Sequence, residues 1–292
     1  MKLSFVIPAY NEEGCIVRCL DSIIREIDGR PDAEIIVVDN NSTDTTCKLV
    51  ARYQSVKLLH EPQKGANRAR QTGFEASQGE LVAFIDADTE MPRGWVARAE
   101  STLLKNPDVL CLSGPFRFYD LPVWTTLLVR TFYLIAYVIY SVSNFLFQKT
   151  TVIQGGNYIL RRWALEKIGG QNVALAFYGD DTDLAVRLSK IGKVKFTFRL
   201  PIDTSGRRLA KEGVFVMAAK YGINNLWTAL FKKPFTTGYK EIRLANNAPK
   251  ASYEPESAAK EWAIGVSALL VFLAILAGIA YLIYVAYRHS LY

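Results

Sequence analysis

Short apolar runs rich in β-branched residues alternate with amphipathic, helix-like stretches from the start of the chain. The runs that predict strands cover residues 3–10, 33–39, 55–60, 81–86 and 109–113. The stretches that predict helices cover residues 12–27, 42–53, 66–77 and 94–104, and Ser42 and Thr43 are N-cap candidates for the second. Strict alternation of strand and helix is typical of an α/β fold with a mainly parallel sheet and helices on both faces.

The alternation stops after residue 113 and resumes at residue 152 with an apolar stretch, a helix that opens with acids, and another strand. These later elements are predicted at 152–162, 178–192 and 193–200. We expect the intervening residues 116–150 to form an apolar helical insertion. Its uncharged part, residues 131–147, is at the lower limit of length for a membrane span. Its aromatic side chains suit the headgroup depth of a bilayer, which favours a helix lying in the membrane interface.

The longest apolar run lies near the C-terminus. Residues 262–287 contain no charged side chain and are long enough to cross the ~30 Å hydrocarbon core of a membrane. A buried core helix is the alternative. Residues 246–261 are polar and proline-containing, which predicts a linker, and residues 288–292 form a short tail. Residues 1–245 then make up the main domain.

Basic residues are distributed unequally about this predicted span: Lys240, Arg243, Lys250 and Lys260 precede it, and Arg288 follows it. Cytoplasmic segments of membrane proteins carry the excess of Lys and Arg. We therefore expect a single-pass cell-membrane protein whose main domain is cytoplasmic. The start of the chain lacks the basic and apolar regions of a signal peptide, so none is predicted.

Composition narrows the function classes. Half of the residues are hydrophobic, and the formal net charge is +7 at pH 7. Since no arginine-rich tract or nucleic-acid motif accompanies this charge, we expect the basic residues to face anionic lipid and not nucleic acid. The four cysteines lack metal-ligand spacing, which predicts free thiols in a reducing compartment.

Polar residues follow three of the predicted strands, in "PAYNE", "DNNSTD" and "DAD". Ligands of parallel sheets bind beyond the carboxyl ends of the strands, so these clusters predict one site. Asp86 and Asp88 can face a divalent cation there, because Mg²⁺ and Mn²⁺ prefer oxygen ligands from carboxylates and substrate phosphates. The alternative for "DAD" is a turn in which Asp88 caps the following helix.

Five segments, in order along the chain, resemble glycosyltransferase family 2, whose members use nucleotide sugars and have the glycosyltransferase-A fold. The segments are "VIPAYNEE" (6–13), "VVDNNSTDTT" (37–46), "KGANRARQ" through "DADTEMPRGWV" (64–96), "GGNYILRR" (155–162) and "GDDTDLAVRL" (179–188). The resemblance extends over residues 3–200 and implies that fold for the main domain. It also implies a UDP- or GDP-sugar as donor.

The resemblance implies roles for individual residues. The implied contacts to the nucleotide sugar are Pro8, Tyr10, Glu12, Asp39, Lys64, Asn67, Arg70, Asp86 and Asp180. Asp39 would meet the base, and Asp88 would hold the cation, Mg²⁺ or Mn²⁺, that bridges the diphosphate. Asn40 and Gln71 depart from the family, which often has a second acid and commonly an asparagine at these positions. For Glu12 and Arg70, ordinary solvated helix faces stay the alternative.

The acids Asp180, Asp181 and Asp183 open a predicted helix, where carboxylates are favoured in any protein, and Asp183 can pair with Arg187 at i+4. In the family the corresponding pair is usually Glu-Asp with the second member as base, which implies Asp181 as the catalytic base. An acceptor hydroxyl must lose a proton as it attacks the anomeric carbon. A cation can stabilise the departing diphosphate. One base and one cation suit a single inverting displacement.

Arg207 and Arg208 could contact a diphosphate or an acceptor phosphate, or face lipid headgroups. Since soluble family members need no anchor, a membrane lipid is the expected acceptor. If residues 131–147 crossed the membrane once, Asp181 would be separated from the other acids of the site. We therefore expect residues 131–147 to lie in the membrane interface; a re-entrant hairpin and a dimer surface stay open as alternatives.

The alternative functions are a catalytically inactive nucleotide-sugar-binding membrane protein and a nucleotidyltransferase. The sequence does not indicate the oligomeric state.

Overall fold

The protein is described from a computed structural model, which defines residues 2–123, 125–134, 152–175 and 178–231 and the positions 233, 235, 236 and 242. The strands are β1 (Leu3–Ala9), β2 (Ala33–Asp39), β3 (Val56–His60), β4 (Leu81–Ile85), β5 (Thr89–Glu90), β6 (Val109–Ser113), β7 (Phe116–Phe118), β8 (Asn157–Arg161), β9 (Lys193–Phe196) and β10 (Ile202–Thr204). The helices are α1 (Ile16–Glu26), α2 (Thr46–Val50), α3 (Ala66–Ala76), α4 (Trp95–Lys105), α6 (Arg162–Lys167), α7 (Asp180–Ser189), α8 (Arg207–Glu212) and α9 (Val214–Phe231). Residues 125–134 are also helical.

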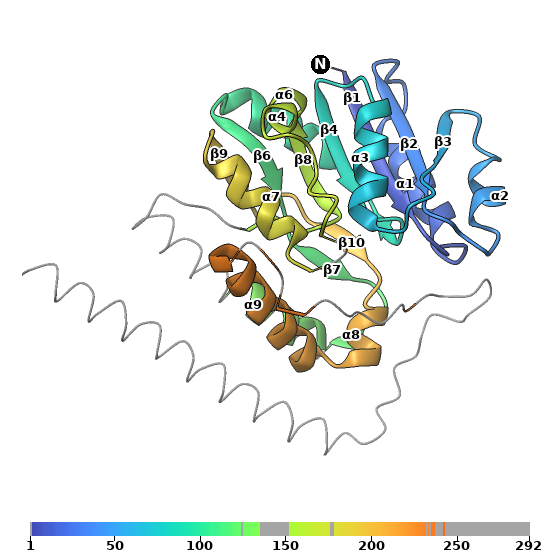
Figure 1. Ribbon diagram of the computed structural model, residues 1–292. Coiled ribbons are helices and arrows are strands. Elements are labelled where there is room, and N and C mark those ends of the chain that lie inside the picture. Colours follow the sequence, from blue (N-terminus) through green and yellow to red (C-terminus); the bar gives the residue numbers. More distant parts are fainter. Residues whose placement is uncertain are drawn as a thin grey trace, which may run out of the picture.

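The main sheet has the strand order β3-β2-β1-β4-β8-β6-β9 (Figure 1). Its neighbours run parallel except at β8, which is antiparallel to both β4 and β6. The reason lies in the connection: β8 begins at Asn157, which pairs with Ile85 at the carboxyl end of β4. β6 ends at that same edge, so β8, which begins there, runs back antiparallel to both of its neighbours. The expected mainly parallel α/β sheet is confirmed, with one antiparallel strand.

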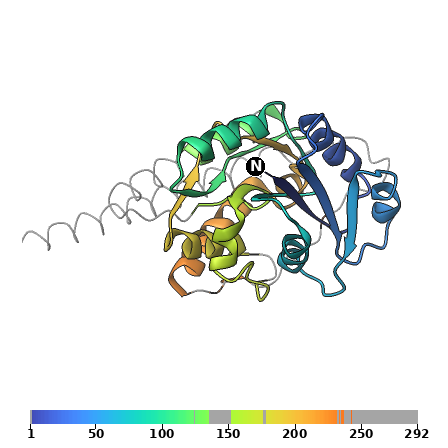
Figure 2. The same ribbon diagram turned by 90° about the horizontal axis from the view of Figure 1, so that it is seen from above.

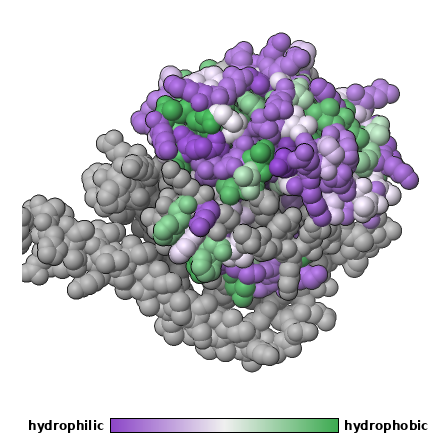
Figure 3. Space-filling view, viewed as in Figure 1, coloured by the Kyte–Doolittle hydropathy of each residue, from purple (hydrophilic) through white to green (hydrophobic). Residues whose placement is uncertain are grey.

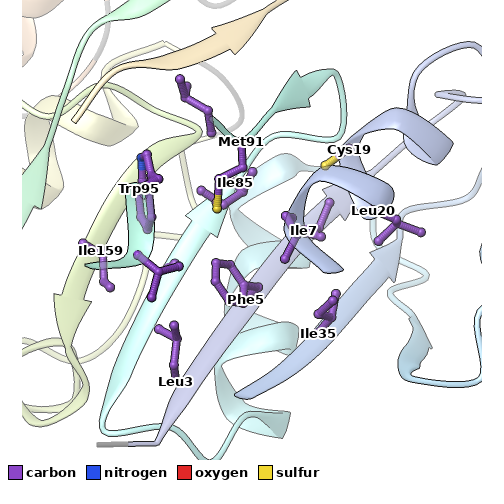
Figure 4. Close-up of a cluster of buried hydrophobic side chains, with 14 of the residues drawn as sticks. Leu3, Phe5, Ile7, Cys19, Leu20, Ile35, Ile85, Met91, Trp95 and Ile159 are labelled. Carbon is purple, nitrogen blue, oxygen red and sulfur yellow. The ribbon is translucent and has the colours of Figure 1, made fainter. Parts of the chain in front are cut away.

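Helices cover both faces of the sheet (Figure 2), and the alternation of side chains along each strand explains how. Phe5 and Ile7 of β1 point to the face covered by α1, α2 and α4, whereas Val6 points to the face covered by α3, α6 and α7. Figure 4 shows the first of these cores, in which Leu20 of α1 and the fully buried Trp95 of α4 pack on the strands. Truncation of a buried tryptophan costs about 3–5 kcal/mol, so Trp95 is a major part of this core.

Helix α3 lies unusually close to the sheet. Gly73 is the reason: a Cβ at this position would collide with the Val6 side chain and touch Val38 Cγ2 at 3.0 Å. The close approach brings the N-terminal half of α3 to the carboxyl ends of β1 and β2. Asn67 and Arg70 are buried there, which corrects the alternative of a solvated helix face for Arg70.

Several local expectations differ from the structure. Helix α2 begins at Thr46 with Thr45 as its N-cap residue, so Ser42 and Thr43 do not cap it; the Ser42 hydroxyl instead accepts a hydrogen bond from the Asn11 amide at 3.0 Å. The expected insertion at 116–150 starts later, because Phe116–Phe118 form β7. This strand joins β10 and β5 in a second, three-stranded sheet in the order β5-β10-β7 that the sequence did not indicate.

Other expectations fall outside the described residues: those for residues 135–150 of the insertion, the linker 246–261, the apolar run 262–287 and the tail 288–292. Within the described part of the chain, no helix combines the length and apolar character needed to cross a bilayer.

Candidate active site

The three polar clusters predicted to meet do meet, at the carboxyl ends of β1, β2 and β4. They border a cavity of about 560 Å³ that extends from β1 towards β9 and is covered by α8 and α9. The predicted site residues that line it are Pro8, Tyr10, Glu12, Lys64, Arg70, Asp86, Asp88, Asp181, Arg207 and Arg208. Asn67 and Asp180 contact this lining through hydrogen bonds to Arg70, whereas Asp39 directly precedes the lining residue Asn40.

Asp39 ends β2 and is 3% exposed. Its carboxylate accepts hydrogen bonds from the Ser42 backbone amide at 3.2 and 3.3 Å and lies 3.1 Å from His60 Nδ1. The next residue, Asn40, donates to the carbonyls of Glu61 and Gln63 at 2.8 Å each and accepts from the Gly65 amide at 2.7 Å. An aspartate could not donate to these two carbonyl oxygens. The departure from the family's second acid therefore has a structural reason.

The loop that Asn40 holds places Lys64 at the cavity. The Lys64 ammonium lies 3.2 Å from the Tyr10 hydroxyl and 4.4 Å from the centre of its ring, which is cation–π geometry. Both residues line the polar end of the cavity, where a cationic group and an aromatic face are available to a nucleotide.

Arg70 joins the two acidic motifs of the site. One terminal nitrogen, Nη2, donates to Asp86 Oδ1 at 2.9 Å, and the other, Nη1, donates to Asp180 Oδ2 at 2.9 Å and Asn67 Oδ1 at 3.1 Å. Its side chain is 7% exposed. Buried charges persist when they are paired and hydrogen-bonded, and here the pairing fixes the position of "DAD" relative to the start of α7.

The turn before β8 contacts the Asp86 carboxylate, which Arg70 also binds. Gly156 has φ +78°, and a Cβ there would collide with the Asp86 carboxyl group. Asn157, fully buried, holds this turn: its side chain donates to the carbonyls of Gly114 and Leu200 at 2.9 Å each and accepts from Trp95 Nε1 at 3.2 Å. In the sequence "GGN", Gly156 therefore allows the backbone to approach the Asp86 carboxyl group, and Asn157 anchors the turn through its side-chain hydrogen bonds.

Asp88 does not cap a helix, because α4 begins at Trp95 with Gly94 as its N-cap residue; that alternative is wrong. Its Oδ2 lies 3.1 Å from Arg207 Nη2. Arg207 also makes a bidentate pair with Glu12, at 2.8 Å to Oε2 and 2.6 Å to Oε1. Glu12 is 6% exposed and Arg207 8%. Neither is a solvated helix face, and Arg207 does not face lipid headgroups.

Arg208 lines the cavity beside Arg207, and its Nη1 lies 3.6 Å from Glu212 Oε1. The role of Arg207 towards its two carboxylates was not expected from the sequence. Its two partners are 195 and 119 positions away in the chain, and no local pattern links them.

Asp181 is the second residue of α7, whose N-cap residue, Gly179, has φ +81°. Burial, followed by repulsion from the neighbouring Asp180 carboxylate, raises the pKa of Asp181 to about 7. The Thr182 amide donates to its Oδ1 at 2.8 Å. A carboxylate with a pKa near neutrality matches the requirement for a general base. The predicted pairing of Asp183 with Arg187 is confirmed, with Nε 2.7 Å from Oδ2.

The end of the cavity nearest β9 is apolar, which the sequence did not indicate. Its lining residues come from β7, the helical residues 125–134, β9, α8 and α9: Phe116, Phe118, Val129, Phe132, Tyr133, Phe196, Leu209, Val214 and Tyr221. Asp181 interacts electrostatically with Arg70 at the polar end and with Tyr133 and Tyr221 at the apolar end. It therefore lies between the two ends. The sequence feature that could have predicted this apolar end is the high frequency of aromatic residues between positions 116 and 133.

The donor set can be tested for a divalent cation. Within the described residues, no group of three or more His, Cys, Asp or Glu side chains is placed to hold a metal ion. Asp88 presents a carboxylate at the cavity, and a hard cation that keeps waters and binds substrate phosphates needs only one or two such ligands. The residues therefore fit Mg²⁺ or Mn²⁺ held jointly with a diphosphate, with Asp88 as the protein ligand.

Comparison with known proteins identifies the family. The chain matches glycosyl transferase family 2 over residues 4–169 and belongs to that family. It is 33% identical over 106 residues to glycosyltransferase AglE of Haloferax volcanii (35% of each chain). It is 30% identical over 211 residues to the probable glycosyltransferase YdaM of Bacillus subtilis (65% of this chain and 47% of the relative). The chain thus spans about a third to a half of the length of these curated relatives.

Solved structures show the fold. Mannosyltransferase PcManGT from Pyrobaculum calidifontis, in complex with GDP-Man and Mn²⁺, aligns with TM-score 0.65 and 24% identity over 78% of this chain and 64% of that one. Glucosyl-3-phosphoglycerate synthase from Mycobacterium tuberculosis, in complex with Mn²⁺, UDP and phosphoglyceric acid, aligns with TM-score 0.55 and 24% identity over 78% of each chain. The expected glycosyltransferase-A fold is confirmed, and sugar transfer is the class of activity that family and fold support.

Proposed function

We propose that the protein is an inverting glycosyltransferase that moves a sugar from a UDP- or GDP-sugar to a hydroxyl or phosphate group of a membrane lipid. The observation that carries this proposal is the position of Asp181. It lies at the boundary of one continuous cavity, between an end lined by paired arginines and carboxylates and an end lined by aromatic and aliphatic side chains. A base at that boundary can reach an acceptor on one side and the anomeric carbon of a donor on the other.

The polar end suits the donor. Lys64 with Tyr10, and Arg70 with Asp86, present the cationic, aromatic and carboxylate groups that a nucleotide sugar can contact. Asp88 would hold a divalent cation, which supplies charge stabilisation to the departing diphosphate. Bound GDP-Man and UDP in the solved relatives support a nucleotide-sugar donor of this kind.

Asp181 would remove the proton from the acceptor as its oxygen attacks the anomeric carbon. Its raised pKa and its hydrogen bond from the Thr182 amide suit a base that is ionised near neutral pH and held in one orientation. Because a single base acts on a single displacement, the anomeric configuration would invert. Asp180 would act through Arg70, to which it is bound, and would not touch the substrate.

The apolar end supports a lipid acceptor. Its wall includes Tyr221 of α9, and the outward side of α9 is also apolar, with Val216 43% and Ile223 47% exposed. Figure 3 shows hydrophobic side chains among hydrophilic ones over α9. We propose that this surface faces the cytoplasmic leaflet, that residues 262–287 anchor the chain in the cell membrane, and that the catalytic domain is cytoplasmic.

A donor panel tests the proposal. Membranes containing the protein are incubated with radiolabelled UDP- and GDP-sugars and Mg²⁺ or Mn²⁺, and the chloroform-extractable fraction is then analysed. We expect label in that fraction for one donor, and none with the Asp181→Asn variant. Binding of a donor without transfer or hydrolysis would favour the catalytically inactive nucleotide-sugar-binding protein. Transfer only to water-soluble acceptors would contradict the lipid.

A further inference from the structure

Arg207 makes the shortest contacts around Asp88, the residue on which the proposed function places the cation. Its guanidinium lies 3.1 Å from Asp88 Oδ2 through Nη2, and the same nitrogen lies 2.6 Å from Glu12 Oε1. The Arg207 and Glu12 side chains are 8% and 7% exposed, and that of Asp88 is 17% exposed. One positive charge is therefore shared between two carboxylates, inside the cavity and away from bulk water.

The two carboxylates hold this guanidinium unequally. Glu12 binds it with both oxygens, in the fork-to-fork geometry that makes arginine–carboxylate pairs strong. Asp88 lies farther from it, with Oδ2 at 3.1 Å from Nη2. Release of Asp88 would therefore leave Arg207 anchored on Glu12.

The backbone beside Arg207 is also anchored. Asp120 accepts hydrogen bonds from the Ser205 hydroxyl at 2.6 Å and the Gly206 amide at 2.5 Å. A Cβ at Gly206 would collide with Leu121, so the segment before α8 packs directly on the chain that follows β7. The start of α8 is thus held by contacts other than the one between Arg207 and the Asp88 carboxylate.

A divalent cation held by Asp88 would lie beside the Arg207 guanidinium, which already contacts Oδ2 of this carboxylate. Two cationic groups at one carboxylate repel each other strongly in a site that water reaches poorly. Among the described residues no group of three or more His, Cys, Asp or Glu side chains could hold a metal ion, so the protein's carboxylates alone offer a cation little compensation for displacing Arg207. A nucleoside diphosphate changes this balance, because its phosphate oxygens can bind the guanidinium in the same forked way that a carboxylate does.

We propose that Arg207 closes the cation site in the donor-free protein and opens it when the diphosphate arrives, by moving from Asp88 to phosphate oxygens while it stays on Glu12. This role rests on the proposed function, since it assumes a nucleotide-sugar donor and a cation at Asp88. It makes the cation and the nucleotide strongly dependent on each other for binding, and by linkage the dependence is mutual. Arg207 thereby becomes a phosphate-binding residue, and Glu12 becomes its positioning residue and not a nucleoside contact.

Mn²⁺ binding to the full chain, measured by electron paramagnetic resonance without nucleotide, tests the proposal. Wild-type protein is expected to bind Mn²⁺ weakly, and Arg207→Gln is expected to bind it at least tenfold more tightly because Asp88 is no longer paired. Arg117→Gln is the matched control: it removes an equal charge from β7, where Arg117 pairs with Asp203 at 2.7 Å outside the cavity, and should change Mn²⁺ affinity less than threefold.

The same titration with UDP or GDP present measures the coupling. In the wild type, the nucleotide that binds should raise Mn²⁺ affinity at least tenfold, and in Arg207→Gln this gain should shrink by a similar factor. If Arg207→Gln fails to fold because Glu12 is left unpaired, Glu12→Gln/Arg207→Gln removes both buried charges and carries the same expectation.

Unchanged or weaker Mn²⁺ affinity in the folded Arg207 variants without nucleotide would overturn this role of Arg207. If the wild type at the same time bound Mn²⁺ with nucleotide, lost that binding in Asp88→Ala and transferred sugar, the proposed function would stand. If no form bound Mn²⁺ with either nucleotide, both the cation part of the proposed function and the role of Arg207 would fail.

Discussion

At the residue scale, the site is a set of charges that neutralise one another before any substrate binds. Arg70 is bound to Asp86 and Asp180, and Arg207 to Glu12 and Asp88. Removing one partner of a buried pair leaves an uncompensated charge, so single substitutions here affect folding as well as function. Asp181 differs, because burial and then the like charge of Asp180 raise its pKa, and the attraction of Arg70 offsets that rise only in part.

Asp181→Asn should lower turnover by a factor of about 100 or more, the usual scale for loss of a general base, and should leave donor and Mn²⁺ binding close to wild type. Steady-state kinetics with titrated donor, together with calorimetric donor binding, measures both. Near wild-type turnover would place the base elsewhere. Asp183→Asn, which weakens the partly buried pair with Arg187 on the same helix, is the control and should retain most activity.

The same residue predicts a pH dependence of stability. An aspartate in an unfolded chain has a pKa near 3.9, whereas that of Asp181 is about 7 in the folded protein. The folded state therefore holds the proton more tightly, and this group makes the protein less stable as pH rises from about 4 to about 7. The Asp181→Asn variant has no carboxyl group at this position, so it does not lose this part of its folding stability as the pH rises. Its Tm should exceed that of the wild type at pH 8 by about 2–4 °C, the shift for roughly 1 kcal/mol in a domain of this size. An equal difference at pH 4 and pH 8, measured by calorimetry, would contradict the assigned shift.

Asp88→Ala should abolish divalent-cation-dependent transfer, and excess EDTA should do the same to the wild type, since the departing diphosphate needs charge compensation. Transfer assays with and without Mn²⁺ check both. Full activity in excess EDTA would remove the cation from the reaction and leave "DAD" as a turn with an ion pair to Arg207.

At the element scale, turns and short strands position the site as much as the central sheet does. Between β6 and β8 the described residues include β7 and the Gly155–Gly156 turn, and Gly156 lies against the Asp86 carboxyl group. Asp120 accepts hydrogen bonds from the Ser205 hydroxyl and the Gly206 amide, and these contacts position the next residue, Arg207. The two-layered core on either side of the sheet keeps these connections in place.

Gly156→Ala should weaken donor binding by about tenfold or more, because its Cβ intrudes on the carboxyl group of Asp86, and it should also cost about 1–3 kcal/mol for a strained backbone. Gly169→Ala is the matched control. Gly169 has φ +81° and nothing within 4 Å of its Cβ position, so it carries the same strain without touching the site. Equal loss of donor affinity in both variants would show that Gly156 matters only for folding.

At the scale of the whole molecule, one cavity connects a charged end under β1 and β4 with an apolar end beside β9, β7 and α9. Aromatic rings continue along α9 beyond the cavity, where Trp227 contacts Phe231 at 4.4 Å and Phe235 at 5.2 Å between ring centroids. Phe231 is 53% exposed and Phe235 60%. Clustered, exposed aromatic side chains of this kind are typical of surfaces that lie at the headgroup depth of a membrane.

A chain shortened to residues 1–245, and so without the run at 262–287, should still float with anionic liposomes in a density gradient. Val216→Ser/Ile223→Ser, on the outward side of α9, should reduce the bound fraction at least fivefold, because apolar area buried in the bilayer drives the binding. Leu104→Ser is the control: Leu104 is 64% exposed on α4, on the opposite side of the sheet from α9's neighbour α7. If the shortened chain stayed in solution, or if all variants bound equally, α9 would not be the membrane-facing surface.

The sequence by itself determined the α/β class, the bounds of β1–β4 and β6 to within a residue, and the clustering of "PAYNE", "DNNSTD" and "DAD" at one edge. These features follow from local rules: a side-chain period of two, strand–helix alternation, and polar residues directly after strands. Only the tertiary structure decided that Arg207 is bound to Glu12, 195 positions away, and that Arg70 joins Asp86 to Asp180, 110 positions away. It also decided the antiparallel direction of β8 and the apolar end of the cavity. Such pairings depend on which surfaces meet when the sheet forms, and the residues near either partner carry no periodic signal of the other.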